Sequence, residues 1–163
     1  MDAPLVTLLT ARRDALAAGL EAALLAHDAP HYKESPPALR RARVDELVAA
    51  FLDAARAGGP APFVAHVQRL AGERAQEGYL LREVQLALSA LEAQAWPIVV
   101  DAGGETDLVV RRLALVTGIV GRGKDELARV FLDHKERAEA RAAQLAERLD
   151  TLFKGTDSPP QAQ

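Results

Sequence analysis

The sequence predicts an all-α protein, on three observations. Non-polar residues recur at steps of three and four along most of the chain, which is the spacing of one face of an α-helix. Proline and glycine gather in short segments between these runs, where helices end. The best candidate for a strand, Leu108 to Val116, also fits the helical spacing, and no turn signal pairs it with a second strand.

Length and composition predict one soluble domain. A chain of 163 residues can bury enough surface for a core without disulfides or metals. Hydrophobic residues make up 49% of the sequence and charged residues 26%, as is typical of soluble globular proteins. The sequence contains no cysteine, which excludes disulfides, thiolate catalysis and cysteine-ligated zinc and fits a cytoplasmic location.

We expect neither a signal peptide nor a membrane span. Asp2, Arg12 and Arg13 interrupt the N-terminal segment before an apolar run of signal-peptide length develops. The longest weakly charged stretch, Leu113 to Val120, is far shorter than the roughly 18 apolar residues of a spanning helix. The sequence therefore predicts no membrane partner.

The charge distribution gives no basis for binding nucleic acid. The net charge is −3, whereas nucleic-acid-binding proteins concentrate lysine and arginine on one face. The nearest cluster is Arg40, Arg41 and Arg43, which we interpret as a solvated helix face.

Two helices are expected in the first third of the chain. The first runs from Pro4 to Ala26, with proline in its first turn. The segment Asp28 to Pro37 contains three prolines and is predicted to be a connecting loop. The second helix runs from Ala38 to Ala57 and stops at Gly58-Gly59-Pro60.

The segment Pro62 to Trp96 is predicted to form two amphipathic helices that meet at a hinge at Gly78. Non-polar residues follow the helical spacing on both sides of this glycine. Because Pro97 cannot donate to a helix ladder, the second of these helices should break near Trp96 or kink before Asp101.

A long helix is expected from Thr106 to about Phe153. Gly118, Gly121 and Gly123 would weaken or bend it by up to about 1 kcal/mol each, so we predict a hinge there. Beyond this hinge, residues at alternating steps of three and four form a heptad seam that requires a partner helix. The seam residues are Ala128, Phe131, Lys135, Ala138, Ala142, Leu145, Leu149 and Leu152.

The domain organisation follows from these elements. Residues 1–123 should form a helical, sensor-like domain and 124–153 a C-terminal helix for dimerisation and signalling. Residues 154–163 are polar and rich in proline, and we expect them to be disordered.

One segment partly matches a phosphate-binding loop. Gly118 to Asp125, GIVGRGKD, fits G-x-x-x-x-G-K-[ST] except at its last position, where aspartate replaces the hydroxyl that ligates magnesium. The motif also needs a preceding strand in a parallel sheet, which this chain does not supply. We interpret the segment as a glycine-softened helix.

The histidines give no convincing metal or haem site. Pro30 separates His27 from His31, and a third metal ligand is missing, so we interpret both histidines as polar residues of a loop. His66 and His134 are each conceivable as the proximal ligand of a haem in a globin-like fold. His134 lies among charged neighbours on an expected exposed face, which leaves His66 as the better of the two haem-ligand candidates. We expect no cofactor and no metal.

Carboxylates near Gly78 could in principle perform acid–base chemistry. Glu73, Glu77, Glu83 and Glu92 lack an accompanying nucleophile or metal set, so the sequence favours a surface ion-pair cluster, and we expect no enzyme. The aromatic residues Tyr79 and Trp96 are interpreted as parts of the core with polar handles.

The segment around Gly78 also carries a family resemblance. Its residues are Glu73-Arg74-Ala75-Gln76-Glu77-Gly78-Tyr79-Leu80-Leu81-Arg82-Glu83-Val84, then Ala87-Leu88, Leu91-Glu92 and Trp96, with Leu39-Arg40, Arg43-Val44, Leu47 and Pro62-Phe63 upstream. Over roughly Leu5 to Leu152 the chain resembles the N-terminal domain of RsbR-type and RsbRD-type stress-signalling proteins. The shared motifs are helical patterns, which are much less specific than a metal or nucleotide signature.

The resemblance implies a globin-like, haem-free sensor domain that forms homodimers and passes its state to an output through its last helix. In that family the output is often a STAS domain, a histidine kinase or a transcription regulator. We expect no output domain after Phe153, so the chain would act on a signalling partner in trans, or its seam would only close a homodimer. A haem- or small-ligand-binding globin and a purely structural dimeric scaffold stay open as alternatives.

Overall fold

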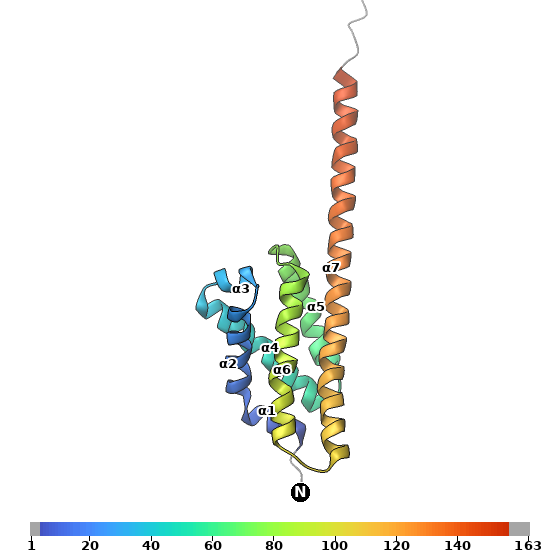
Figure 1. Cartoon of the computed structure of the whole chain (residues 1–163). Coiled ribbons are helices and arrows are strands. Elements are labelled where there is room, and N and C mark those ends of the chain that lie inside the picture. The colour runs from blue at the N-terminus through green and yellow to red at the C-terminus, as the bar shows by residue number, and fades with distance from the viewer. Residues whose placement is uncertain (1–3, 157–163) are drawn as a thin grey trace, which may run out of the picture.

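The computed structural model describes residues 4–156, with side chains described as far as Phe153, and these residues form seven α-helices and no strand (Figure 1). The prediction of an all-α protein is confirmed. No helix in this part of the chain is long and apolar enough to cross a membrane. The helices are α1 (Leu5–Ala11), α2 (Arg13–Ala26), α3 (Pro30–Glu34), α4 (Pro37–Ala57), α5 (Ala61–Gln76), α6 (Leu81–Asp101) and α7 (Thr106–Thr156).

The helices pack into a body from which half of α7 projects. In Figure 1, α2, α6 and the first half of α7 stand side by side, and α6 packs between the other two. The helix α4 contacts α1, α2 and α5, and α5 in turn packs along α7. The second half of α7 continues beyond the body without a neighbour (Figure 1).

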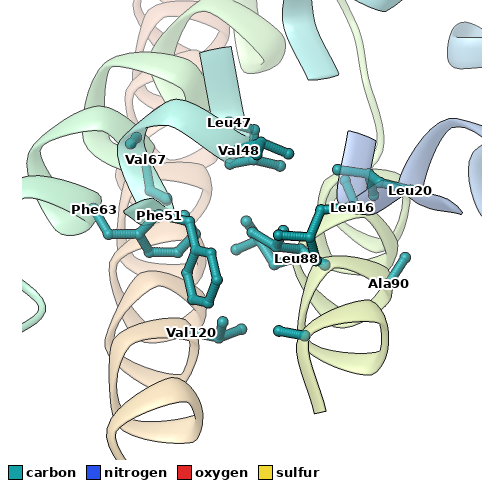
Figure 2. Packing of buried hydrophobic residues seen from close by; sticks show 14 of the residues in the cluster. Leu16, Leu20, Leu47, Val48, Phe51, Phe63, Val67, Leu88, Ala90 and Val120 are labelled. Carbon is teal, nitrogen blue, oxygen red and sulfur yellow. The ribbon is translucent and has the colours of Figure 1, made fainter. Parts of the chain in front are cut away.

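The core lies where α2, α4, α5, α6 and α7 meet. The rings of Phe51 and Phe63 pack edge to face with centroids 6.1 Å apart, next to Leu88 and Val120 (Figure 2). All four side chains are fully buried. Each fully buried side chain of this size stabilises the fold by about 1.5–3 kcal/mol relative to the exposed state, so these contacts hold α7 on the body.

The first predicted helix is interrupted once. Arg12 leaves helical geometry with φ −113° and ψ 15°, which separates α1 from α2. Leu9 of α1 and Leu16 of α2 are both fully buried, and each of these two helices packs on α4 and α6. Helical spacing alone does not reveal a break that tertiary packing imposes.

The predicted connecting loop contains a short helix, so that prediction is wrong in part. The helix α3 begins at Pro30, and proline is compatible with a first helical turn because its missing N–H has no partner there. Tyr32 is the buried residue of α3 and fixes the helix to the body.

The helix α6 does not break at Pro97. It continues to Asp101, with Ala95 and Val99 buried on either side of the proline. The buried face of α6, which also includes Val84, Leu88 and Leu91, outweighs the roughly 3 kcal/mol that proline costs in a helix interior. The ring of Trp96 points outward and is 46% exposed, so the interpretation of this residue as part of the core is wrong.

The helix α7 runs without interruption through the three glycines, and no hinge separates residue 123 from 124. The helix α5 packs tightly against α7 at Gly123, because a Cβ atom built on this residue would lie 2.5 Å from Cε1 of Phe63. A Cβ on Gly118 would meet no atom within 4 Å. The glycine at 123 therefore serves packing rather than flexibility.

This contrast gives a matched pair of substitutions. Gly123→Ala should lower the free energy of unfolding by about 1–3 kcal/mol, because overpacking against Phe63 exceeds the gain in helix propensity. Gly118→Ala should raise it by up to about 1 kcal/mol, since only the propensity term applies. Urea unfolding followed by circular dichroism measures both, and equal effects at the two positions would contradict the packing at Gly123.

The prediction of a disordered tail from residue 154 is wrong for residues 154–156, which belong to α7. The helix continues to Thr156, three residues past the predicted end, and the remainder of the predicted disordered tail, 157–163, lies outside the described residues.

Candidate functional site

The best-built polar site joins α3, α4 and the α5–α6 connection. We define the Glu83 cluster as Glu83, His31, Tyr79, Arg43 and Glu77, which are linked by hydrogen bonds and ring stacking. These residues come from distant parts of the sequence, and the fold brings them together at one end of the body.

Glu83 is the centre of this cluster and is fully buried. Its carboxylate accepts three hydrogen bonds, from the backbone N–H of His31 at 3.0 Å, from His31 Nδ1 at 2.7 Å and from the backbone N–H of Leu80 at 2.9 Å. The bond to Leu80 caps the N-terminus of α6, where a carboxylate also interacts favourably with the helix dipole. The two bonds to His31 attach α3 to that same helix end.

Tyr79 connects the same region to α4 and α5. Its ring stacks on His31 with centroids 4.6 Å apart, and its hydroxyl accepts a hydrogen bond from Arg43 at 2.6 Å. Arg43 also binds both carboxylate oxygens of Glu77 at 3.0 Å, and Glu77 accepts a further bond from the buried Arg74. Gly78 permits this geometry because its φ of +83° turns the chain between Glu77 and Tyr79.

The three clustered arginines do not form a solvated face, so that interpretation is wrong. Arg40 is buried and donates to Glu21 and to the carbonyl oxygens of Tyr32 and Ser35. Arg43 belongs to the Glu83 cluster, and Arg41 pairs with Asp45 on the surface. Arginine side chains that bind carbonyls and carboxylates of their own chain are not free to bind phosphate groups.

The surroundings determine the ionisation of two groups. Burial raises the pKa of Glu83, but the N–H hydrogen bonds from Leu80 and His31 outweigh it, so the net pKa lies below the ordinary 4.5. Burial raises the pKa of Tyr32 to about 12 despite the positive charge of Arg74 nearby. At neutral pH the cluster therefore contains an ionised carboxylate, and the adjoining phenol is neutral.

Acid should weaken the fold through Glu83. Because the folded protein binds this proton more weakly than the unfolded chain, the stabilisation is complete above about pH 4.5 and is lost as pH falls through the lower folded-state pKa. We expect the urea midpoint of the wild type to fall more steeply below pH 4.5 than that of Glu83→Gln. Parallel curves for the two proteins between pH 6 and pH 3 would contradict this assignment.

The cluster does not assemble a reactive site in the described residues. The oxygens of Glu83 are occupied by N–H groups of the chain itself, and the hydroxyl of Ser35 donates to the carbonyl of His31. No group of three or more histidine or acidic side chains in residues 4–153 could hold a metal ion. The interpretation of Glu83 as part of a surface ion-pair cluster is wrong, because Glu83 is buried. The interpretation of His31 as a polar loop residue is also wrong, because its hydrogen bonds to Glu83 attach α3 to the end of α6.

His66 lies on α5, beside a groove of about 420 Å³ between α4 and α5 that is also lined by Glu46, Asp53 and Arg69. Its Nδ1 accepts a hydrogen bond from Arg69 at 3.0 Å, and its Nε2 is buried without a partner among the described residues. Burial and the charge of Arg69 lower the pKa of His66, although Glu46 and Glu73 oppose them. The neutral imidazole of His66 is thus hydrogen-bonded to Arg69 through Nδ1. His134, the other haem-ligand candidate, lies exposed on α7.

The partial phosphate-loop match has no loop. Gly118 to Asp125 lies within the continuous helix α7, where backbone N–H groups bond to the preceding turn. Lys124 binds Glu92 of α6 at 3.0 Å, so its ammonium group joins two helices. The interpretation of this segment as helical is confirmed.

The predicted seam divides into two parts. Ala128 and Phe131 are half-buried, and Phe131 packs against the core. From Lys135 onward every seam residue is exposed, including Leu145 at 59%, Leu149 at 53% and Leu152 at 67%. A helix that presents leucine side chains to solvent at coiled-coil spacing leaves apolar surface that a partner would cover.

The residues that carry the family resemblance are not one site. Glu83, Tyr79 and Arg74 are buried in or beside the Glu83 cluster, with Gly78 at the turn, whereas Glu73 and Leu80 are exposed nearby. Trp96 lies four turns further along α6, on the outer surface. Sequence reasoning missed His31 and Arg43 as members of the cluster, because no local spacing connects them to Glu83.

Comparison with protein-family models, with curated proteins and with solved structures gives no match to this chain. The likeness to RsbR-type sensor domains therefore has no support beyond the residues quoted above, and the functional argument rests on the structure.

Proposed function

We propose that this chain is a non-catalytic, cytoplasmic regulatory domain that forms a homodimer through α7 and relays a change in its body along that helix to a signalling partner. The globin-like, RsbR-type identity belongs to the same proposal. The observation that carries it is the projecting half of α7, whose leucines are exposed at heptad spacing while its first half is fixed to the body.

The helix is connected to the body in a way that suits a relay. Phe63 of α5 packs on Gly123, and Glu92 of α6 binds Lys124, so two consecutive residues of α7 contact two different helices. A shift of α5 relative to α6 would therefore move α7 at residues 123 and 124, just before its projecting half begins. Packed helix interfaces switch between discrete arrangements rather than deforming continuously.

The seam has the composition of a weak interface. Lys135 occupies a core position, and Ala138 and Ala142 supply little apolar area beside it. A lysine at a core position of a coiled coil lowers its stability. A weak pairing can be changed by a differential binding energy of a few kcal/mol, which is the range available to a ligand or partner.

The experiment that tests this proposal compares hydrogen exchange in two variants of the full chain. Lys135→Leu should favour the dimer and Leu149→Asp the monomer. Because coupling between two sites is reciprocal, a relay along α7 predicts that amides in α6 and in the Gly78 turn exchange at different rates in the two proteins. If exchange differs only after residue 124, the chain is a dimeric scaffold without a relay, which is the second candidate.

The haem alternative has its own test. His66 is the candidate ligand, and a purified protein with a Soret absorption band that His66→Ala removes would replace the haem-free proposal.

A further inference from the structure

The imidazole of His66 is held in an arrangement that only its neutral form can keep. Its Nδ1 lies 3.0 Å from Nη2 of Arg69, and because a guanidinium group can only donate, Nδ1 is the acceptor and carries no proton. The proton of the neutral ring is therefore on Nε2, which is buried and has no acceptor among the described residues. The neutral ring thus has one satisfied nitrogen and one buried donor without a partner.

Protonation of His66 would break its contact with Arg69. A charged imidazole carries an N–H on both nitrogens, so Nδ1 would present a hydrogen to the N–H groups of the guanidinium. Two donors with like charges repel each other at a separation of 3.0 Å. The ring must then turn about its side-chain torsions until its N–H groups find acceptors elsewhere.

The groove between α4 and α5 provides space and an acceptor for the turned ring. It has a volume of about 420 Å³, and His66 lines it together with Glu46 and Asp53 of α4. Glu46 is close enough for its negative charge to favour the protonated form of His66. Asp53 is already bound to Arg56, which leaves Glu46 as the preferred acceptor on α4.

The charges that surround His66 come from two helices. They are Glu46 and Asp53 on α4, with Arg69, Glu73 and Arg74 on α5. Burial contributes most to the lowered pKa of His66, the two arginines add to it, and Glu46 and Glu73 oppose it. The charged residues of α7 that approach α5 line a different groove, beside Val64. Val64 points away from His66, since residues two apart on a helix lie on nearly opposite sides.

The helix α5 connects His66 to α7. Phe63 precedes His66 by three residues on the same continuous helix, and its ring packs on Gly123 of α7. A bond from His66 to Glu46 would draw α5 towards α4, and packed helices respond to such forces by shifting as units over 1–2 Å or so, on the order of what helix interfaces tolerate. The contact between Phe63 and Gly123 would change with that shift.

We propose that His66 is a proton-dependent switch between α4 and α5, bound to Arg69 when neutral and turned into the groove onto Glu46 when protonated. Mild acid is then a signal that changes the body. Its transmission to α7 rests on the proposed relay, whereas the switch between α4 and α5 does not.

The pKa of the His66 ring tests the two bonds separately. Nuclear magnetic resonance follows this ring in the full chain from pH 8 to pH 5, and His66→Gln identifies its signal. Arg69→Gln should raise the pKa and Glu46→Gln should lower it, each by on the order of a threefold change in the acid dissociation constant. Glu136→Gln, on the projecting half of α7, is the control and should leave the pKa of His66 unchanged. An unchanged pKa in Glu46→Gln would overturn the bond to α4.

The switch also predicts a loss of stability at milder acidity than that of Glu83. Because the folded protein binds the His66 proton more weakly than the unfolded chain, this contribution is complete above the ordinary pKa of 6.5. It is lost as pH falls from there through the lower folded-state pKa. The urea midpoint of the wild type should therefore fall more steeply between pH 6.5 and pH 5 than that of His66→Gln, and equal slopes would contradict the assignment.

Backbone amide signals in the same titration separate the switch from the relay. In the wild type, amides of α4 near Glu46, of α5 and of α7 at Gly123 should all shift with the midpoint of the His66 ring. These shifts should be absent in His66→Gln and kept in His134→Gln, whose histidine is exposed on α7. Shifts confined to α5 would overturn the switch. Shifts in α4 and α5 without any at Gly123 would leave the switch in place and count against the proposed relay.

Discussion

Replacing Glu83 with glutamine should lower the free energy of unfolding by about 3 kcal/mol, which corresponds to a fall in Tm of about 6–12 °C for a protein of this size. The carboxylate accepts from two donors of His31 and from the N–H of Leu80 in a fully buried position. Glutamine offers one acceptor oxygen and turns its NH₂ group toward a donor, so at least one buried N–H group loses its partner. A buried donor without a partner costs about 1–3 kcal/mol, and loss of the charge weakens the bonds that remain.

The matched control is Glu73→Gln on the exposed side of α5. Glu73 lies 3.9 Å from Arg74 and is more than half exposed, so its replacement should change stability by less than about 0.5 kcal/mol. Thermal and urea unfolding of both variants measure the difference. Equal small losses would show that Glu83 does not hold α3 on the body, and α3 would then need another anchor.

The second large effect is expected in the association of two chains. Leu149→Asp should weaken dimerisation by at least 100-fold, as measured by sedimentation equilibrium over a range of concentrations. Each buried leucine contributes about 1.5–3 kcal/mol, the dimer contains two copies, and a tenfold change in affinity corresponds to about 1.4 kcal/mol. The substitution also places two carboxylates opposite each other in the seam.

The fold of the monomer should not change in this variant, since Leu149 is exposed and contacts no other helix of the described body. Leu25→Asp on α2 is the control, because Leu25 is exposed to a similar degree, at 42%, but lies away from α7. A loss of association in both variants would indicate non-specific apolar contacts. An unchanged association constant for Leu149→Asp would remove the seam from the interface.

The sequence was sufficient for the helices but not for their interruptions. Helical spacing predicted α4 to within one residue and the start of α7, because α4 and the first half of α7 each bury one continuous face. The break at Arg12, the short α3 and the passage of α6 through Pro97 depend on what each segment packs against. Local propensities carry no information about such tertiary contacts.

The polar cluster shows the same limit for a site. Glu83 looks like one acidic residue among several on an amphipathic helix, and its burial follows only once α3 places His31 over the end of α6. The pairing spans 52 residues of sequence, for which no spacing rule exists. By contrast, the seam of α7 lies within one helix, so its exposed leucines could be identified from their spacing alone.

The molar mass of the full chain in solution tests the central proposal most directly. Light scattering on the wild type should give twice the chain mass of 17.5 kDa at micromolar concentrations, and Leu149→Asp should give the mass of a single chain under the same conditions. A wild type that stays at 17.5 kDa up to concentrations of hundreds of micromolar would contradict a regulatory domain that acts through a dimer of α7.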